Sequence, residues 1–115
     1  MLDYRRAARR QRGYQALTQG MVAVAAGDAE EAKKFARKAD GLLNEPPLTM
    51  LLSAQAAQLE GDEDAARRYF EEMLKKPDMA FLGVRGLLMQ AVRQDNKAEA
   101  LRLAERAFQL RPDTP

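Results

Sequence analysis

Side chains that commonly carry enzyme chemistry are scarce in this chain of 115 residues. It contains no His and no Cys, so the commonest general base, the thiol nucleophile and most transition-metal ligands are absent. Adjacent carboxylates occur at Glu30-Glu31 and Glu71-Glu72, but Lys residues four positions after Glu30, Glu71 and Glu72 predict ion pairs on exposed helix faces. No Asp-rich loop has the spacing of a calcium site. The sequence therefore predicts a protein that is not an enzyme and that holds no metal or cofactor.

The elements that would position functional side chains are indicated by a pattern that repeats every 34 residues. The pairs Gly27-Asp28, Gly61-Asp62 and Asp95-Asn96 follow one another at this interval. An alanine comes four residues after each pair, at Ala32, Ala66 and Ala100. A fixed period of this length with helical composition is typical of stacked helix–turn–helix repeats.

Apolar residues between these pairs recur at spacings of three and four, which places them on one side of a helix. We expect the first residue of each pair to adopt the left-handed conformation that ends a helix, and the second to cap the next helix. Prolines (Pro46-Pro47, Pro77 and Pro112) are expected to end the second helix of each repeat. The expected helices cover residues 13–26, 29–43, 47–60, 63–75, 79–94 and 97–110, with 3–12 as an extra helix or an extension.

The repeat pattern resembles the tetratricopeptide repeat family. A small residue stands at the family's position 8 in two repeats, as Gly20 and Ala54, but is Leu88 in the third. The usual aromatic at position 4 is missing, and of the prolines only Pro112 is in phase. The resemblance implies an all-α, right-handed superhelix of three repeats (about 13–46, 47–80 and 81–114) after an Arg-rich segment, 1–12. It also implies protein binding as the function.

A narrower resemblance, to the HemY family of bacterial membrane proteins, lies in residues 5–17, 20–28, 47–57 and 83–87. That family is linked to late haem biosynthesis, and its members carry N-terminal membrane spans before tetratricopeptide-like repeats. The chain itself has no apolar run of the length that a spanning helix needs. The resemblance therefore implies a soluble fragment of an inner-membrane-anchored protein. Placed just after a membrane span, the basic segment 1–12 would favour the cytoplasmic side for the repeats, because cytoplasmic flanks carry an excess of Lys and Arg.

The HemY resemblance also raises an alternative function, a carrier or regulator that acts directly in haem or porphyrin metabolism. Only Tyr4, Tyr14, Tyr69 and six Met could serve as axial ligands to haem iron. We interpret Tyr69 and Met73 as core or near-core residues, so the sequence favours the interaction scaffold.

The resemblance to tetratricopeptide repeats implies that the first helix of each repeat lines a concave groove for a protein or peptide. Mapped onto this chain, the groove is mostly apolar with a few polar side chains, as peptide-binding grooves are. Leu17 and Met21 replace key residues of the family's clamp for a C-terminal carboxylate, which disfavours binding of that kind. The candidate groove residues are Tyr14, Leu17, Met21, Val24, Leu48, Leu51, Gln55, Gln58, Leu82, Arg85, Met89 and Arg93.

Two further surfaces stand out. Residues 1–12 contain five arginines and a single acidic residue, whereas the rest of the chain has slightly more acidic than basic side chains. This cluster could contact anionic lipid, bind nucleic acid or remain solvated. Scarce aromatic residues disfavour nucleic acid, and the HemY resemblance favours lipid. The cluster comprises Arg5, Arg6, Arg9, Arg10 and Arg12.

The last predicted helix, 97–110, carries more apolar residues than one packing stripe needs, among them Leu101, Ala104 and Phe108. A terminal repeat normally turns a polar face to water. We therefore expect the chain to self-associate through this helix or through the groove.

Overall fold

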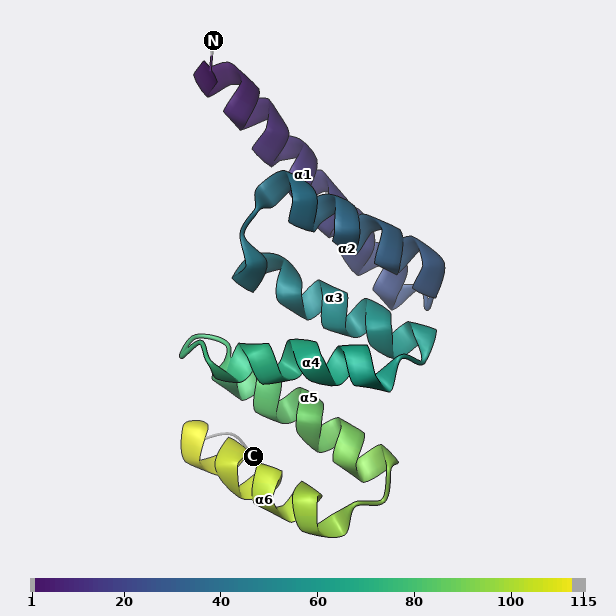
Figure 1. Ribbon diagram of the computed structural model, residues 1–115, viewed down its shortest axis with the longest axis vertical. Helices are drawn as coiled ribbons and strands as arrows, with labels where there is room; N and C mark the ends of the chain where they lie inside the picture. Colours follow the sequence, from purple (N-terminus) through teal and green to yellow (C-terminus); the bar gives the residue numbers. More distant parts are fainter. Residues whose placement is uncertain (1, 113–115) are drawn as a thin grey trace. The chain divides into compact units, whose positions relative to one another are not determined.

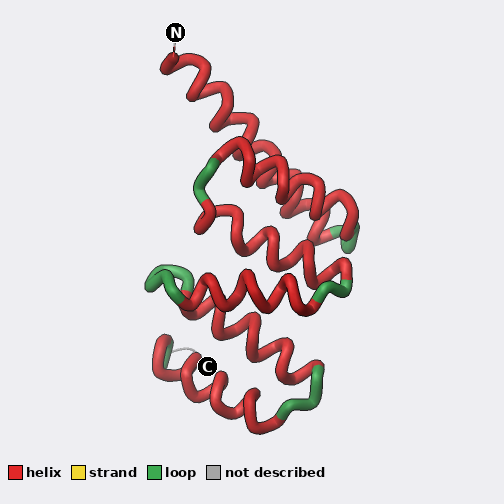
Figure 2. The backbone as a smooth tube through the Cα atoms, viewed as in Figure 1, coloured by secondary structure: helices red, strands yellow, loops and turns green. Residues whose placement is uncertain are grey.

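The computed structural model describes residues 2–112, which form six helices joined by short turns (Figures 1 and 2). No strand occurs among these residues. The all-α class predicted from the sequence is thus confirmed, and most helix ends lie within one residue of the expected positions. The helices are α1 (Leu2–Ala25), α2 (Ala29–Leu43), α3 (Pro46–Glu60), α4 (Glu63–Leu74), α5 (Ala80–Arg93) and α6 (Lys97–Leu110).

Residues 3–12 extend the first helix and do not form a separate one. The helix α1 runs unbroken through 24 residues, so the Arg-rich segment forms its first turns. Figure 1 shows these turns projecting past the end of α2.

The helices form two compact units, the first ending at Asp62 and the second beginning at Glu63. In the first unit, α1 packs against both α2 and α3, and α2 also packs against α3. In the second unit, α5 packs against α4 and α6. The division falls between α3 and α4, which are the two helices of the second repeat predicted from the sequence.

The 34-residue period is present in the backbone as three turns with the same hydrogen bonds. The amides of Asp28, Asp62 and Asn96 each donate to the carbonyl five residues earlier, at 2.9 Å in every case. The residue before each of them is left-handed, with φ of 74° at Gly27, 85° at Gly61 and 57° at Asp95. This pattern satisfies carbonyls that a helix end leaves free, and it confirms the left-handed residues predicted at all three positions.

Side-chain caps begin the helices that follow the first and third turns. The Asp28 carboxylate accepts a hydrogen bond from the Glu31 amide at 3.1 Å, and the Asn96 side chain accepts one from the Glu99 amide at 3.2 Å. Both caps agree with the sequence prediction.

The prediction that Pro46-Pro47 end the second helix was wrong. The helix α2 ends at Leu43, and Asn44 then adopts φ of 51° as its left-handed C-cap. Pro46 instead begins α3. A proline is well suited to a first helical turn, because its fixed φ is helical and its missing amide hydrogen would have no partner there.

Small residues bring the helices of the first unit close together. Glycines on α1 leave no room for a side chain: a Cβ on Gly13 would lie 2.6 Å from Leu43 Cγ, and one on Gly20 would lie 2.5 Å from Leu52 Cδ2. Ala23 and Ala32 stand before and after the turn that joins α1 to α2, and they pack with Ala56 in one buried cluster. The core of this unit is therefore built from close backbone approach rather than from large side chains.

The second unit contains the same kind of contact between α4 and α5. A Cβ on Gly83 would lie 2.6 Å from the Phe70 carbonyl oxygen, and one on Gly86 would lie 2.3 Å from the Phe70 ring. Met73 and Val84 are fully buried in this unit. Phe70 thus packs on α5 with its backbone carbonyl at Gly83 and its ring at Gly86.

Gly61→Val should lower the free energy of unfolding by about 1–3 kcal/mol, because a β-branched residue is strained at φ of 85°. Space is not the cause, since no atom outside Gly61 and its two chain neighbours lies within 4 Å of the position that a Cβ would occupy. Gly41→Val is the matched control, because Gly41 has equally open surroundings but lies inside α2. Equal thermal stability of the two variants would show that the left-handed conformation at residue 61 is not required.

Gly83→Ala should be destabilising by roughly 1–3 kcal/mol, since the new methyl group meets a backbone carbonyl that cannot rotate away. Gly41→Ala should raise stability by up to about 1 kcal/mol through helix propensity alone. Chemical denaturation of both variants measures the difference. If Gly83→Ala is as stable as the unmodified chain, α4 and α5 are further apart than described.

Candidate functional site

The candidate groove residues of the first unit lie on α1 and α3, on either side of the contact between Gly20 and Leu52. Tyr14 and Met21 on α1 are 41% and 59% exposed, and Leu48 on α3 is 42% exposed. The other predicted members, Leu17, Val24, Leu51, Gln55 and Gln58, are half-buried. The first unit therefore presents partly exposed apolar side chains on two packed helices, with two glutamines among them.

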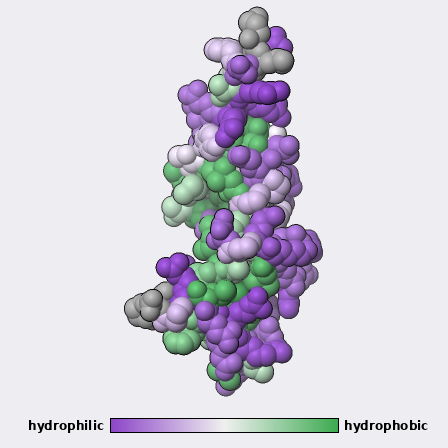
Figure 3. Space-filling model, turned by 90° about the vertical axis from the view of Figure 1, so that its left-hand side faces the viewer, coloured by the Kyte–Doolittle hydropathy of each residue, from purple (hydrophilic) through white to green (hydrophobic). Residues whose placement is uncertain are grey.

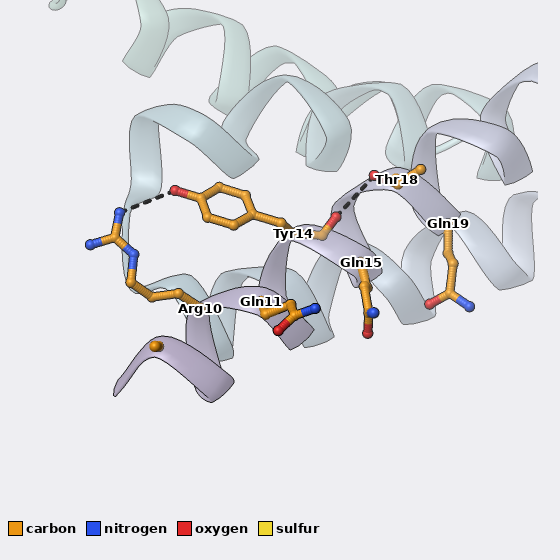
Figure 4. Close-up of a pocket in the computed structure, with 7 residues that line it drawn as sticks. Arg10, Gln11, Tyr14, Gln15, Thr18 and Gln19 are labelled. Carbon is orange, nitrogen blue, oxygen red and sulfur yellow. Dashed lines mark hydrogen bonds between the residues drawn. The ribbon is translucent and has the colours of Figure 1, made fainter. Parts of the chain in front are cut away.

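A polar junction ties α1 to the start of α3. The Arg10 guanidinium donates to the Tyr14 hydroxyl at 3.1 Å (Figure 4). It also lies 3.9 Å from the carboxylate of Glu45, just before α3. The hydrogen bond to Tyr14, the charge interaction with Tyr14 and then that with Glu45 raise the pKa of Arg10. This junction directs the Tyr14 hydroxyl toward Arg10, a contact that the assignment of Tyr14 to the groove did not include.

Sequence reasoning missed a polar face on α1. Gln11, Gln15 and Gln19 follow one another at one-turn intervals, and Gln15 and Gln19 project to the same side in Figure 4. With Ala7, Arg10, Tyr14 and Thr18 they line a shallow, open depression. The spacing of the glutamines was the available signal. The depression lies on the exposed side of one helix, so it is a weaker candidate for a binding site than the α1–α3 face.

In the second unit, the candidate residues Leu82, Arg85, Met89 and Arg93 lie along α5. Arg85 and Met89 are exposed and Leu82 is half-buried. Arg93 forms an ion pair within the unit, because its guanidinium lies 3.3 Å from the Glu63 carboxylate. The buried Gln90 also binds Glu63, donating to its carbonyl and carboxylate oxygens at 2.9 Å. Arg93 therefore helps to hold α5 against the start of α4.

The arginine cluster divides into two groups. Arg9 donates to the Gly41 carbonyl in the last turn of α2 at 2.9 Å, and Arg10 forms the junction with Tyr14 and Glu45. Arg5, Arg6 and Arg12 are exposed, and no hydrogen bond or ion pair involves them within residues 2–112. Two of the five predicted lipid-facing residues thus stabilise the first unit, which leaves three free cations.

The residues considered for chemistry lie in ordinary structural surroundings. Met73 is fully buried and Tyr69 is 39% exposed. The acidic pair on α4 forms surface ion pairs, but with different partners from those predicted: Glu72 with Lys75 at 2.9 Å, and Glu71 with Arg67 at 3.9 Å. Among the described residues no three His, Cys, Asp or Glu side chains are grouped so that they could hold a metal ion.

Large apolar side chains reach the surface in both units, and Figure 3 shows one face on which apolar patches are bordered by hydrophilic residues. The helix α6 is the extreme case, since none of its residues is buried. Leu101 and Phe108 are each 61% exposed, whereas Leu103 and Ala107 are half-buried. The helix is therefore covered on one side only, and Leu101, Ala104 and Phe108 form its open stripe.

These features describe an all-helical protein of helix–turn–helix units. Residues 1–61 match the family model described as HemY protein N-terminus, and the chain belongs to that family. Comparisons with curated proteins and with solved structures gave no significant match. Within the described residues, no helix is both long enough and apolar enough to cross a membrane. The family match confirms the HemY resemblance drawn from the sequence.

Self-association through α6 is expected, because the exposed stripe of Leu101, Ala104 and Phe108 is a liability in a monomer. Leu101→Glu combined with Phe108→Glu should convert the associated chain to a monomer. Light scattering over a concentration series measures the change. Val22→Glu is the control, since Val22 is 64% exposed on a different helix. A strictly monomeric unmodified chain at high concentration would contradict this expectation.

Proposed function

We propose that this chain is a non-catalytic module that binds a protein partner along the α1–α3 face of the first unit. The observation that carries the proposal is the exposure of Tyr14, Met21 and Leu48 beside the tight Gly20–Leu52 contact. Apolar side chains that stay in water on a rigid pair of helices are typical of a surface that a partner covers.

The chemistry of this face favours an amphipathic partner helix or an extended apolar segment. Met21 is flexible and polarizable, so it can adapt to different partner side chains. The Tyr14 ring is held by Arg10, so it loses little freedom on binding. Half-buried Gln55 and Gln58 on α3 can offer hydrogen bonds at the edge of the apolar area. The proposed partner thus has apolar side chains at helical spacing with polar groups beside them.

The proposal extends to the setting of the module. The resemblance to tetratricopeptide repeats supports a scaffold role, because such repeats bind other proteins. Membership of the HemY family supports a module that is part of a membrane-anchored protein. The basic segment 1–12 supports the cytoplasmic side for the repeats, since cytoplasmic flanks of membrane spans are enriched in Lys and Arg. In that setting the partner would be a protein at or in the membrane.

The test is a matched pair of substitutions at neighbouring exposed residues of α1. Met21→Glu should weaken binding of a partner captured from membranes by about 10- to 100-fold, because a charge replaces a central apolar contact. Val22→Glu should leave the affinity unchanged, since Val22 is as exposed as Met21 but lies about 100° further round the helix. Titration of the purified chain with the partner gives both affinities.

Equal effects of the two substitutions would contradict the proposed face. Titration with haem and porphyrins tests the alternative function, a carrier or regulator in haem or porphyrin metabolism. Saturable, stoichiometric binding with a shifted absorption band would instead support a direct role in tetrapyrrole metabolism. No spectral change is the result expected of a protein-binding module.

A further inference from the structure

We propose that Arg5, Arg6 and Arg12 form a face of α1 that binds the headgroups of anionic lipids, and this inference is independent of the α1–α3 binding face. The first turns of α1 project beyond α2 (Figure 1). From residue 3 to residue 12, every side chain except the half-buried Ala8 is exposed. These turns thus lack the packing partners that the rest of α1 has in the first unit.

The basic face continues the packing face of the helix. Ala16, Gly20 and Ala23 are buried against the first unit at spacings of four and three residues. The same spacing, followed toward the N-terminus, reaches Arg12, Arg9 and Arg5. The stripe therefore changes from small residues to arginines at the point where α2 ends.

The hydrogen bond from Arg9 to the Gly41 carbonyl marks this point of change. On either side of it along α1, the described part of the chain offers no carboxylate or carbonyl partner to Arg5, Arg6 or Arg12. Arg5 and Arg12 are two turns apart, about 10 Å along the helix, and Arg6 lies beside Arg5. Arg5 and Arg12 thus display unpaired guanidinium groups on one side of α1, and Arg6 adds a third at the edge of that side, about 100° round from Arg5.

Charge complementarity identifies an anionic partner, and the surroundings favour a lipid surface over nucleic acid. Outside residues 1–12 the chain has more acidic than basic side chains, so a long polyanion would meet repulsion beyond the first turns, whereas a membrane surface need touch only the projecting end. This end of α1 also offers few aromatic side chains on which bases could stack. Tyr14 is engaged by Arg10, and Tyr4 is the only aromatic residue in the sequence of residues 1–12.

The experiment is sedimentation of the full chain with vesicles of phosphatidylcholine alone or mixed with phosphatidylglycerol. Binding should require phosphatidylglycerol and weaken as salt is raised. The triple variant R5Q/R6Q/R12Q should lose on the order of 100-fold in affinity, since each basic residue near the surface contributes about fivefold. R5K/R6K/R12K keeps the charges and should bind as the unmodified chain does. Circular dichroism verifies that each variant retains its helices.

R37Q/K38Q/R68Q is the matched control, because it removes three exposed cations that have no partner among the described residues. Equal losses in this control and in R5Q/R6Q/R12Q would overturn the proposal, as would equal binding to the two vesicle types. Tighter binding to duplex DNA than to phosphatidylglycerol vesicles, dependent on the same arginines, would replace lipid by nucleic acid. Displacement from vesicles by millimolar inorganic phosphate at constant ionic strength would assign the site to free phosphate.

Discussion

Close approach of neighbouring helices at residues without bulk is the constraint on which both units depend. In the first unit, Gly20 lets α1 reach Leu52 on α3, and in the second, Gly83 lets α5 reach the backbone of α4 at Phe70. At each contact the two helices lie close together. The positions of the side chains beside the glycines are therefore set by the paths of the two helix backbones. The exposed Met21 and the half-buried Leu17 flank the Gly20 contact for this reason.

The turns were the part of the fold that the sequence specified best. Left-handed residues are restricted by sterics, so Gly27 and Gly61 could be assigned from residue type alone, and Asp95 followed from the period. Asn44 adopts the same conformation, but it stands outside the repeated pairs and was missed. Pro46 was misassigned because proline can either follow a helix or begin one. Deciding between these roles requires knowledge of where the neighbouring chain lies.

The site residues could be predicted less completely than the fold. The mapping of tetratricopeptide positions assigned Tyr14 and Met21 to the groove, and both side chains are exposed on α1. It could not indicate that Arg9 reaches Gly41 or that Arg93 reaches Glu63, because these pairs are about thirty residues apart in the chain. Such contacts depend on which helix ends meet in space. Composition counted five arginines as equivalent, whereas tertiary structure distinguishes two that are engaged from three that are free.

The unbroken course of α1 has a mechanical consequence. Its 24 residues form one rod about 36 Å long, with the arginine face at one end and the Gly20 contact toward the other. No hinge separates the two, so whatever holds the first turns also sets the direction in which Tyr14 and Met21 point. A flexible tether would limit only distance, whereas a continuous helix also limits orientation. A partner arriving at a fixed angle would then give up less rotational freedom on docking.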